Sequence, residues 1–160
     1  MSLKKNESAR SRFMDRAIAV ARRGILAGQH PYGAAIVRNG RLLVAEHNTV
    51  RSTLDATAHA EVCAIRAACR KIHGVDLSGC EIYCTCEPCA MCMGACYFSG
   101  IGKIYFGAFI ADKFAFGLPD LGVGASILSK IGTGAPKVTG GVWREKCVEL
   151  FKLFLEKDRS

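Results

Sequence analysis

The sequence predicts an α/β sandwich, in which a mixed β-sheet carries helices on both faces. Two observations predict it. Apolar residues recur at helical spacing near both ends of the chain, and short apolar runs of strand character lie between the helical segments. The resulting order, α-β-β-α-β-α-β-(α)-β-α, is typical of a layered α/β protein. We expect one domain over residues 1–160, because the chain has the length of a single ordinary domain and shows neither a repeat nor a low-complexity linker.

The first half of the chain predicts two helices around a hairpin. Residues 8–27 form an amphipathic pattern in which apolar side chains recur on one face: Phe13, Ala17, Ala21 and Ile25. Two apolar runs then flank Asn39-Gly40, the dipeptide that most strongly indicates a β-hairpin turn. A second helix is expected over residues 59–72, ending at Gly74, with an inner face made of Val62, Ile65, Cys69 and Ile72.

The second half predicts three more strands and further helices. "CEIYCT" and "KIYFGAF" have strand character, and the segment after Pro88 reads as a helix, since proline is favoured in a first helical turn. Residues 111–136 are rich in glycine and predict only a short helix at "ASILSKI". "KVTGGV" is consistent with a last strand. The terminal segment "WREKCVELFKLFLEK" predicts an amphipathic helix with an inner face of Val148, Phe151 and Leu155.

Charge and composition narrow the functional class. The net charge is +8, and residues 1–23 hold seven Lys and Arg residues against two acidic ones. This segment is either the solvated face of the first helix or a footprint for RNA. No apolar stretch reaches the ~20 residues of a membrane span, and no apolar signal-peptide core follows the basic start. We therefore expect a cytoplasmic protein without a membrane segment.

The stretch "CEPCAMCMGAC" concentrates the cysteines at positions 86, 89, 92 and 96. This spacing matches that of bacterial iron–sulfur proteins, but Tyr97 follows the fourth cysteine where those proteins have proline, and no second cysteine run exists. A Cys-x-x-Cys pair at a helix start is compatible with a redox pair, a closed structural zinc site or an open catalytic zinc site. A third ligand elsewhere in the chain would separate these readings.

"TAHAEV" supplies that third ligand. It places His59 and Glu61 at the start of the second helix, as "EPCAMC" places Cys89 and Cys92 at the start of the third. If the two helix starts face each other, one imidazole and two thiolates meet and leave the fourth zinc position to water. Zinc lowers the pKa of its water toward neutrality, and Glu61 is placed to move that water's proton. The combination favours a catalytic zinc site.

This combination fits the H-x-E…P-C-x-x-C signature of zinc nucleobase deaminases. The chain resembles the cytidine-deaminase-like superfamily, in its nucleobase and tRNA-editing branch, from about residue 9 to at least residue 120. The resemblance implies that His59, Cys89 and Cys92 bind one Zn²⁺ per subunit and that Glu61 is the general acid and base. It also implies a five-stranded sheet flanked by helices in a three-layer sandwich, usually assembled as a homodimer.

Several segments resemble bacterial guanine deaminases in particular. "HPYGAAIVRNGRLLVAEHN" is similar to their hairpin that ends in a substrate-binding Asn, here Asn48, and "ADKFAFGLPD" is similar to a stretch whose final Asp assists purine recognition, here Asp120. An Asn side chain presents a donor and an acceptor to a base edge. The backbone of Ala60 is a further candidate contact for the exocyclic amine. A nucleobase is therefore the expected substrate, with guanine favoured.

Other features leave alternatives open. Guanine deaminases end in a tail with an active-site Tyr, whereas this chain has no Tyr after Tyr105. "SGIGKIYFGA" and the last helix resemble tRNA adenosine deaminases, whose RNA substrate would here contact basic residues near the N-terminus: Arg10, Arg12, Arg16, Arg22 and Arg23. The short terminal helix is also similar to that of fungal-type cytosine deaminases. A non-catalytic zinc or redox module requires Cys84 or Cys86 to close the metal site.

Overall fold

The computed structural model describes the backbone of residues 2–159 and the side chains of residues 11–159. At its centre is a five-stranded mixed sheet with strand order β2-β1-β3-β4-β5. Strand β1 (Gly33–Arg38) pairs antiparallel with both β2 (Arg41–His47) and β3 (Cys80–Cys86). Strands β3, β4 (Lys103–Ala108) and β5 (Lys137–Thr139) are parallel to one another. The predicted sandwich and its five-stranded mixed sheet are confirmed.

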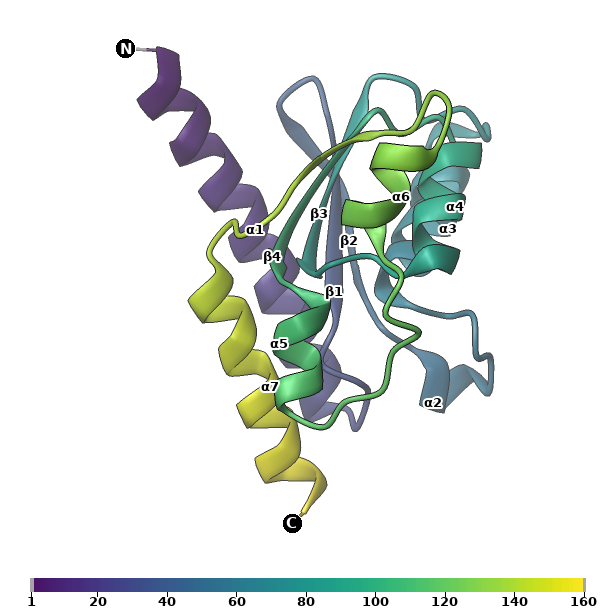
Figure 1. Cartoon of the computed structure of the whole chain (residues 1–160). Coiled ribbons are helices and arrows are strands. Elements are labelled where there is room, and N and C mark those ends of the chain that lie inside the picture. The colour runs from purple at the N-terminus through teal and green to yellow at the C-terminus, as the bar shows by residue number, and fades with distance from the viewer. Residues whose placement is uncertain (1, 160) are drawn as a thin grey trace.

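Helices cover both faces of this sheet, as Figure 1 shows. Helices α1 (Ser2–Leu26) and α7 (Arg144–Asp158) lie on one face. Helices α3 (Ala60–Ile72), α4 (Ala90–Phe98) and α6 (Ala125–Ile131) lie on the other. Two short helices, α2 (Val50–Thr53) and α5 (Ile110–Ala115), follow β2 and β4. Within residues 2–159, no helix is both long enough and apolar enough to cross a membrane.

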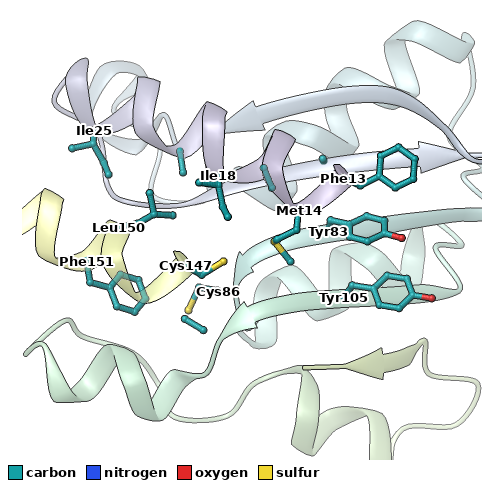
Figure 2. Packing of buried hydrophobic residues seen from close by; sticks show 14 of the residues in the cluster. Phe13, Met14, Ile18, Ile25, Tyr83, Cys86, Tyr105, Cys147, Leu150 and Phe151 are labelled. Carbon is teal, nitrogen blue, oxygen red and sulfur yellow. The ribbon is translucent and has the colours of Figure 1, made fainter. Parts of the chain in front are cut away.

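The sheet separates two cores. The first core packs α1 and α7 against the sheet through large side chains that include Phe13, Met14, Tyr83, Leu150 and Phe151 (Figure 2). The second core packs α3, α4 and α6 against the opposite face around Ile36, Ile82 and Phe106. Neighbouring residues of β1 alternate between the two cores, as a strand buried on both faces requires.

The hairpin forms at the predicted position. Asn39 and Gly40 have φ values of 51° and 69°, so both central residues of the turn adopt the left-handed conformation. Asn and Gly tolerate positive φ, and a two-residue turn of this kind matches the right-handed twist of the strands it connects. The turn fixes the antiparallel register in which Arg38 pairs with Arg41. This register determines where β2 ends and therefore where Asn48 lies.

Two predicted helix faces are wrong by part of a turn. In α3 the buried residues are Ala60, Glu61, Ala64 and Ala68, whereas Val62, Ile65, Cys69 and Ile72 are only partly buried. Small alanine side chains let this helix approach the sheet closely, and the larger apolar residues pack at its flanks. In α7 the buried face is Cys147, Leu150, Phe151 and Phe154; Phe151 is as predicted, but Val148 and Leu155 are partly exposed.

The glycine-rich segment contains more structure than the sequence predicts. Helix α6 is confirmed at the predicted residues, but α5 was not predicted. Helix α5 begins after Phe109, whose backbone N–H donates a hydrogen bond of 2.8 Å to the side chain of Asp112. An acidic side chain that returns to the N-cap backbone satisfies a donor that the helix itself leaves free. This short helix carries Lys113 into the interior next to the site described below.

Candidate functional site

The predicted metal donors lie at two helix starts that face each other. His59 is the residue that precedes α3, and Cys89 is the residue that precedes α4; both have extended backbone conformations. Cys92 lies in the first turn of α4. The Nδ1 atom of His59 lies 3.7 Å from Cys89 Sγ and 3.6 Å from Cys92 Sγ. The structure therefore brings together three side chains that come from segments about 30 residues apart in the sequence.

The three donors fit a zinc ion. Their ligand atoms all lie within 4.8 Å of one another, and among residues 11–159 they are the group of three or more His, Cys, Asp and Glu side chains that is compact enough to hold a metal. One imidazole and two thiolates form a typical zinc donor set, and three protein ligands leave one tetrahedral position open. Cys84 and Cys86 do not belong to this group.

The electrostatics of the two thiols are asymmetric. The hydrogen bond with Cys92 lowers the pKa of Cys89 to about 4; burial opposes this change, and the hydrogen bond with His59 reinforces it. The same hydrogen bond with Cys89, together with burial, raises the pKa of Cys92. Cys89 is therefore the sulfur that is held as a thiolate, and the helix N-terminus adds to this effect because it favours negative charge. The site is therefore suited to binding a cation.

Three other cysteines near the site lie outside the donor group: Cys84, Cys86 and Cys96. Burial raises the pKa of both Cys84 and Cys96, which are fully buried in the second core. Burial also raises the pKa of Cys86, at the end of β3. Each of these side chains therefore stays a neutral thiol. The predicted distinction between two metal-binding and two packing cysteines in the "CEPCAMCMGAC" run agrees with this geometry.

Glu61 is buried beside the donors. Its side chain belongs to the first turn of α3, and Cys92 Sγ donates a hydrogen bond of 3.4 Å to Glu61 Oε2. Burial, the largest effect on this carboxyl, raises the pKa of Glu61. A carboxyl whose pKa is raised by burial exchanges protons more readily near neutral pH than an exposed one does. Glu61 is therefore a candidate proton-transfer group.

A cleft of about 580 Å³ leads to these residues. Asn48, His59, Cys89 and Asp120 line it, and so do residues that were not predicted, among them His30, Tyr32, Lys113 and Phe154. A narrow inner recess continues from the cleft to Glu61 and shares Tyr32, His59, Cys89, Lys113 and Asp120 with it. Ala60 does not line the cleft; its side chain is buried in the second core.

Asn48 presents an unused donor to the cleft. Its side chain is 1% exposed, and Oδ1 accepts a hydrogen bond of 3.1 Å from the backbone N–H of Val50. Its Nδ2 is the buried side-chain polar atom that lacks a hydrogen-bond partner within residues 11–159. A buried amide without a partner is costly unless a ligand satisfies it. This atom is therefore the point at which a substrate acceptor would fit.

The last helix closes the cleft of its own chain. Phe154, Leu155 and Asp158 of α7 all line the cleft. Asp158 forms an ion pair of 2.9 Å with Arg51, which also lines the cleft. Sequence reasoning found the helix but not its role as a wall, because neither periodicity nor spacing shows which end of a sheet a terminal helix reaches.

Comparison with known proteins identifies the family. The profile of the cytidine and deoxycytidylate deaminase zinc-binding region matches residues 7–108. The chain is similar to the guanine deaminase of Bacillus subtilis, at 39% identity over 68% of this chain and 70% of that enzyme. It is also similar to the tRNA-specific adenosine deaminase of Aquifex aeolicus, at 44% identity over 60% of this chain and 64% of that enzyme, slightly under two thirds of its length.

The fold has a close structural relative as well. The guanine deaminase from Nitrosomonas europaea superposes with a TM-score of 0.83 at 27% identity, covering 94% of this chain and 85% of that one. The profile match spans His59, Glu61, Cys89 and Cys92 and more than half of the chain. The predicted superfamily and its zinc cofactor are thereby confirmed. The chain belongs to the zinc-binding cytidine and deoxycytidylate deaminase family, whose members include guanine and tRNA adenosine deaminases.

Proposed function

We propose that this protein hydrolyses the exocyclic amine of a free nucleobase, with guanine as the favoured base, and releases ammonia. One observation carries the proposal: the compact donors His59, Cys89 and Cys92 lie beside the buried carboxyl of Glu61 at the inner end of a cleft. The donors would hold Zn²⁺. When bound there, zinc supplies a water molecule whose pKa is low enough for it to act as a nucleophile at neutral pH.

Glu61 carries out the proton transfers of this proposal. Its carboxylate accepts a proton from the attacking water and delivers it to the ring nitrogen beside the amine-bearing carbon, so that water adds across the C=N bond. Glu61 then moves a second proton from the new hydroxyl group to the amine. The C–N bond breaks, ammonia leaves, and a carbonyl group forms on the ring. The recess that Glu61 lines holds about 20 Å³, room for one water molecule between Glu61 and a base in the adjoining cleft.

The remaining site residues orient the base. Asn48 Nδ2 donates to an acceptor on the ring, which satisfies its unused hydrogen-bonding capacity. Asp120 accepts from an N–H group, and the backbone N–H or carbonyl of Ala60 is a further contact for the departing amine. The cleft is also of the size typical of small-molecule sites, which range from about 300 to 1,000 Å³.

The decisive experiment is an ammonia-release screen over guanine, adenine, cytosine, their nucleosides and an anticodon stem-loop. Release from guanine above all others is the expected result. Glu61→Ala should keep its zinc and lose turnover, because it removes the proton carrier and leaves the donors in place. Turnover that persists in Glu61→Ala would contradict the assignment. If ammonia were released mainly from cytosine, the protein would be a cytosine deaminase and not a guanine deaminase.

Adenosine in a tRNA anticodon loop is the second candidate. It is favoured by the similarity to the Aquifex enzyme and by exposed arginines along α1: Arg12, Arg16, Arg22 and Arg23. Arg10, Lys4 and Lys5 lie outside the described side chains. An α-helix rises 1.5 Å per residue, so Arg12 lies about 20 Å from Leu26, the last residue of α1. This candidate predicts RNA binding that weakens steeply with salt; a flat salt response would count against it.

A homodimer belongs to the same proposal. Exposed apolar side chains gather on the adjoining helices α4 and α6: Met91, Tyr97, Phe98, Ile127 and Ile131. The Phe98 side chain is 88% exposed, and a groove of about 660 Å³ runs between the two helices. Apolar patches of this kind mark interaction surfaces. Phe98→Glu should yield a monomer in sedimentation, whereas the control Leu26→Glu, at the exposed end of α1 on the opposite face of the sheet, should leave the dimer intact.

A further inference from the structure

A buried ion pair lies in the cleft. Lys113 Nζ donates a hydrogen bond of 2.7 Å to Asp120 Oδ2, and the side chains of the two residues are only 11% and 5% exposed. Removing two charges from water is costly, and their attraction often fails to compensate for that cost. Such a pair is therefore a poor device for stability. Its place in a cleft makes a functional role the better explanation.

The pair lies where a base would bind. Lys113 and Asp120 line both the cleft and the inner recess, together with Tyr32, His59 and Cys89. Lys113 Nζ also lies 5.1 Å from the centre of the Tyr32 ring, whose face attracts a cation and fixes the position of the ammonium group. A base whose amine reaches Glu61 therefore shares one cavity with the pair.

Both side chains of the ion pair can form further hydrogen bonds. An ammonium group has three donors, and within residues 11–159 the hydrogen-bond acceptor of Lys113 is Asp120 alone. The carboxylate of Asp120 accepts from Lys113 at Oδ2 and from the Gly122 backbone N–H at Oδ1, at 3.0 Å, and the Leu121 backbone N–H also interacts with it. Each carboxylate oxygen can accept a second hydrogen bond. A free donor and a free acceptor are thus available side by side.

We propose that Lys113 and Asp120 together recognise a ring amide of the base, Lys113 by donating to its C=O and Asp120 by accepting from the adjacent N–H. This inference rests on the proposed function and names the substrate class of that site. Guanine carries such an N–H/C=O pair in its six-membered ring, and free cytosine carries one as well. Adenine has none. Lys113 is thereby a specificity-determining residue that selects amino bases with a ring amide and rejects adenine.

The test compares substrates that differ only in the ring amide. 2-Aminopurine keeps the amine of guanine but lacks its C=O and N–H, and 4-aminopyrimidine stands in the same relation to cytosine. Lys113→Met should lower kcat/KM for guanine or cytosine by about 10- to 100-fold, because a hydrogen bond from a charged donor is lost. The values for 2-aminopurine and 4-aminopyrimidine should change little. If Lys113→Met lowered kcat/KM equally for guanine and 2-aminopurine, or equally for cytosine and 4-aminopyrimidine, the inference would be overturned.

Three further variants separate recognition from folding. Lys113→Arg keeps a cation and should retain the preference for the ring amide. Lys152→Met, at an exposed position of α7 outside the cleft, is the matched control and should behave as wild type. If Lys113→Met does not fold because Asp120 is left as a lone buried charge, the Lys113→Met/Asp120→Asn double variant repeats the comparison without that charge. It should show the same loss of preference.

A binding measurement distinguishes failure of this inference from failure of the proposed function. Hypoxanthine has the ring amide of guanine without its amine, and purine lacks both. In the Glu61→Ala background, calorimetry should give a Kd for hypoxanthine about 10- to 100-fold below the Kd for purine. When Lys113→Met is added, the two Kd values should become similar. If the variants bind in this way but the wild type deaminates no free base, the proposed function fails alone. If the Kd values are equal before Lys113→Met is added, the inference fails alone.

Discussion

Arg51 and Asp158, 107 positions apart in the chain, form an ion pair of 2.9 Å between Nη1 and Oδ1. Arg51 belongs to the short helix α2 after the hairpin, and Asp158 is the last residue of α7. The guanidinium also donates to the backbone carbonyl of Gly28 and lies 5.4 Å from the centre of the Phe154 ring. One side chain therefore connects three segments around the mouth of the cleft.

Arg51→Met should open this mouth without unfolding the protein. Half-exposed ion pairs contribute about 0–1 kcal/mol, so the melting temperature should change little. Hydrogen exchange in the last two turns of α7 should become faster, because the helix end loses its partner. KM for the base should rise. The matched control is Arg70→Met on the exposed face of α3, and unchanged exchange in Arg51→Met would show that α7 is held by its apolar face alone.

Zinc content tests the donor set directly. His59→Ala, Cys89→Ala and Cys92→Ala should each lower the metal from about one ion per chain to near zero, because two remaining donors bind zinc weakly. Cys96→Ala, in the same helix but outside the donor group, should retain its zinc. Elemental analysis of the purified proteins gives the result. Retained zinc in the Cys92 variant would require a different third ligand.

Asn48→Asp tests the unused amide donor. The change keeps an acceptor for the Val50 N–H and replaces the unpartnered Nδ2 with an oxygen that cannot donate. We expect kcat/KM for the base to fall by about 10- to 100-fold, since a buried hydrogen bond to the substrate is lost. Asn39→Asp, in the exposed turn of the hairpin, should leave kcat/KM as in wild type. An unchanged value in Asn48→Asp would remove Asn48 from the substrate site.

Glu87 is the residue whose loss should most disturb the segments around the metal donors. Its Oε1 accepts from the Ser126 backbone N–H at 2.9 Å, and its Oε2 accepts from the Ile110 backbone N–H at 3.3 Å. The carboxylate thus ties the starts of α5 and α6 to the loop that carries Cys89. Each hydrogen bond to a charged group contributes about 1.5–3 kcal/mol, so Glu87→Ala should destabilise the fold by about 2 kcal/mol or more. Thermal unfolding measures this, with the exposed Glu145→Ala as control.

The pH dependence of stability should reflect the pair formed by Asp112 and Arg144. Hydrogen bonds from the Arg144 guanidinium are the main cause that lowers the pKa of Asp112; burial opposes this, and the Phe109 N–H adds to it. A carboxyl with a lowered pKa stabilises the fold above its unfolded pKa of about 3.9, and this contribution is lost as the pH falls through its folded pKa. The melting temperature of Arg144→Gln should therefore lie below that of wild type at pH 7.

The difference in melting temperature between wild type and Arg144→Gln should stay constant down to about pH 5. It should disappear as the solution becomes more acidic than about pH 4. Arg41→Gln, at an exposed position of the hairpin, is the control that should show no such difference. A difference that persisted in strong acid would mean that Arg144 stabilises the fold through its stacking on Phe109 and not through Asp112.

Local patterns were sufficient to predict the sheet and the metal donors. Asn39-Gly40 determines a turn that few other dipeptides form, and His59 and Cys89 each precede a helix whose start is recognisable from the sequence. These features depend on neighbours within a few residues. The assignment of Cys89 and Cys92 to the metal came from the H-x-E…P-C-x-x-C pattern, since helical spacing alone leaves Cys96 on the same side of α4.

Features that depend on distant contacts were not predictable. Lys113 lies in a glycine-rich segment where a lysine would ordinarily be exposed, and its buried ammonium group contacts the Tyr32 ring, 81 positions earlier in the chain. The inner face of α3 consists of alanines because the helix lies close to the sheet, and apolar periodicity gives most weight to the larger residues beside them. The contact of α7 with the cleft likewise depends on Arg51, more than 100 positions earlier in the chain.

The residues that line the cleft come from two parts of the chain, one inside the family profile and one after it. The family profile ends at residue 108 and includes every metal donor and Glu61. Lys113 and Asp120, and the α7 residues Phe154, Leu155 and Asp158, all follow it. Under the proposed assignment, a change in the last third of the chain would therefore alter contacts with the base and leave the metal donors in place.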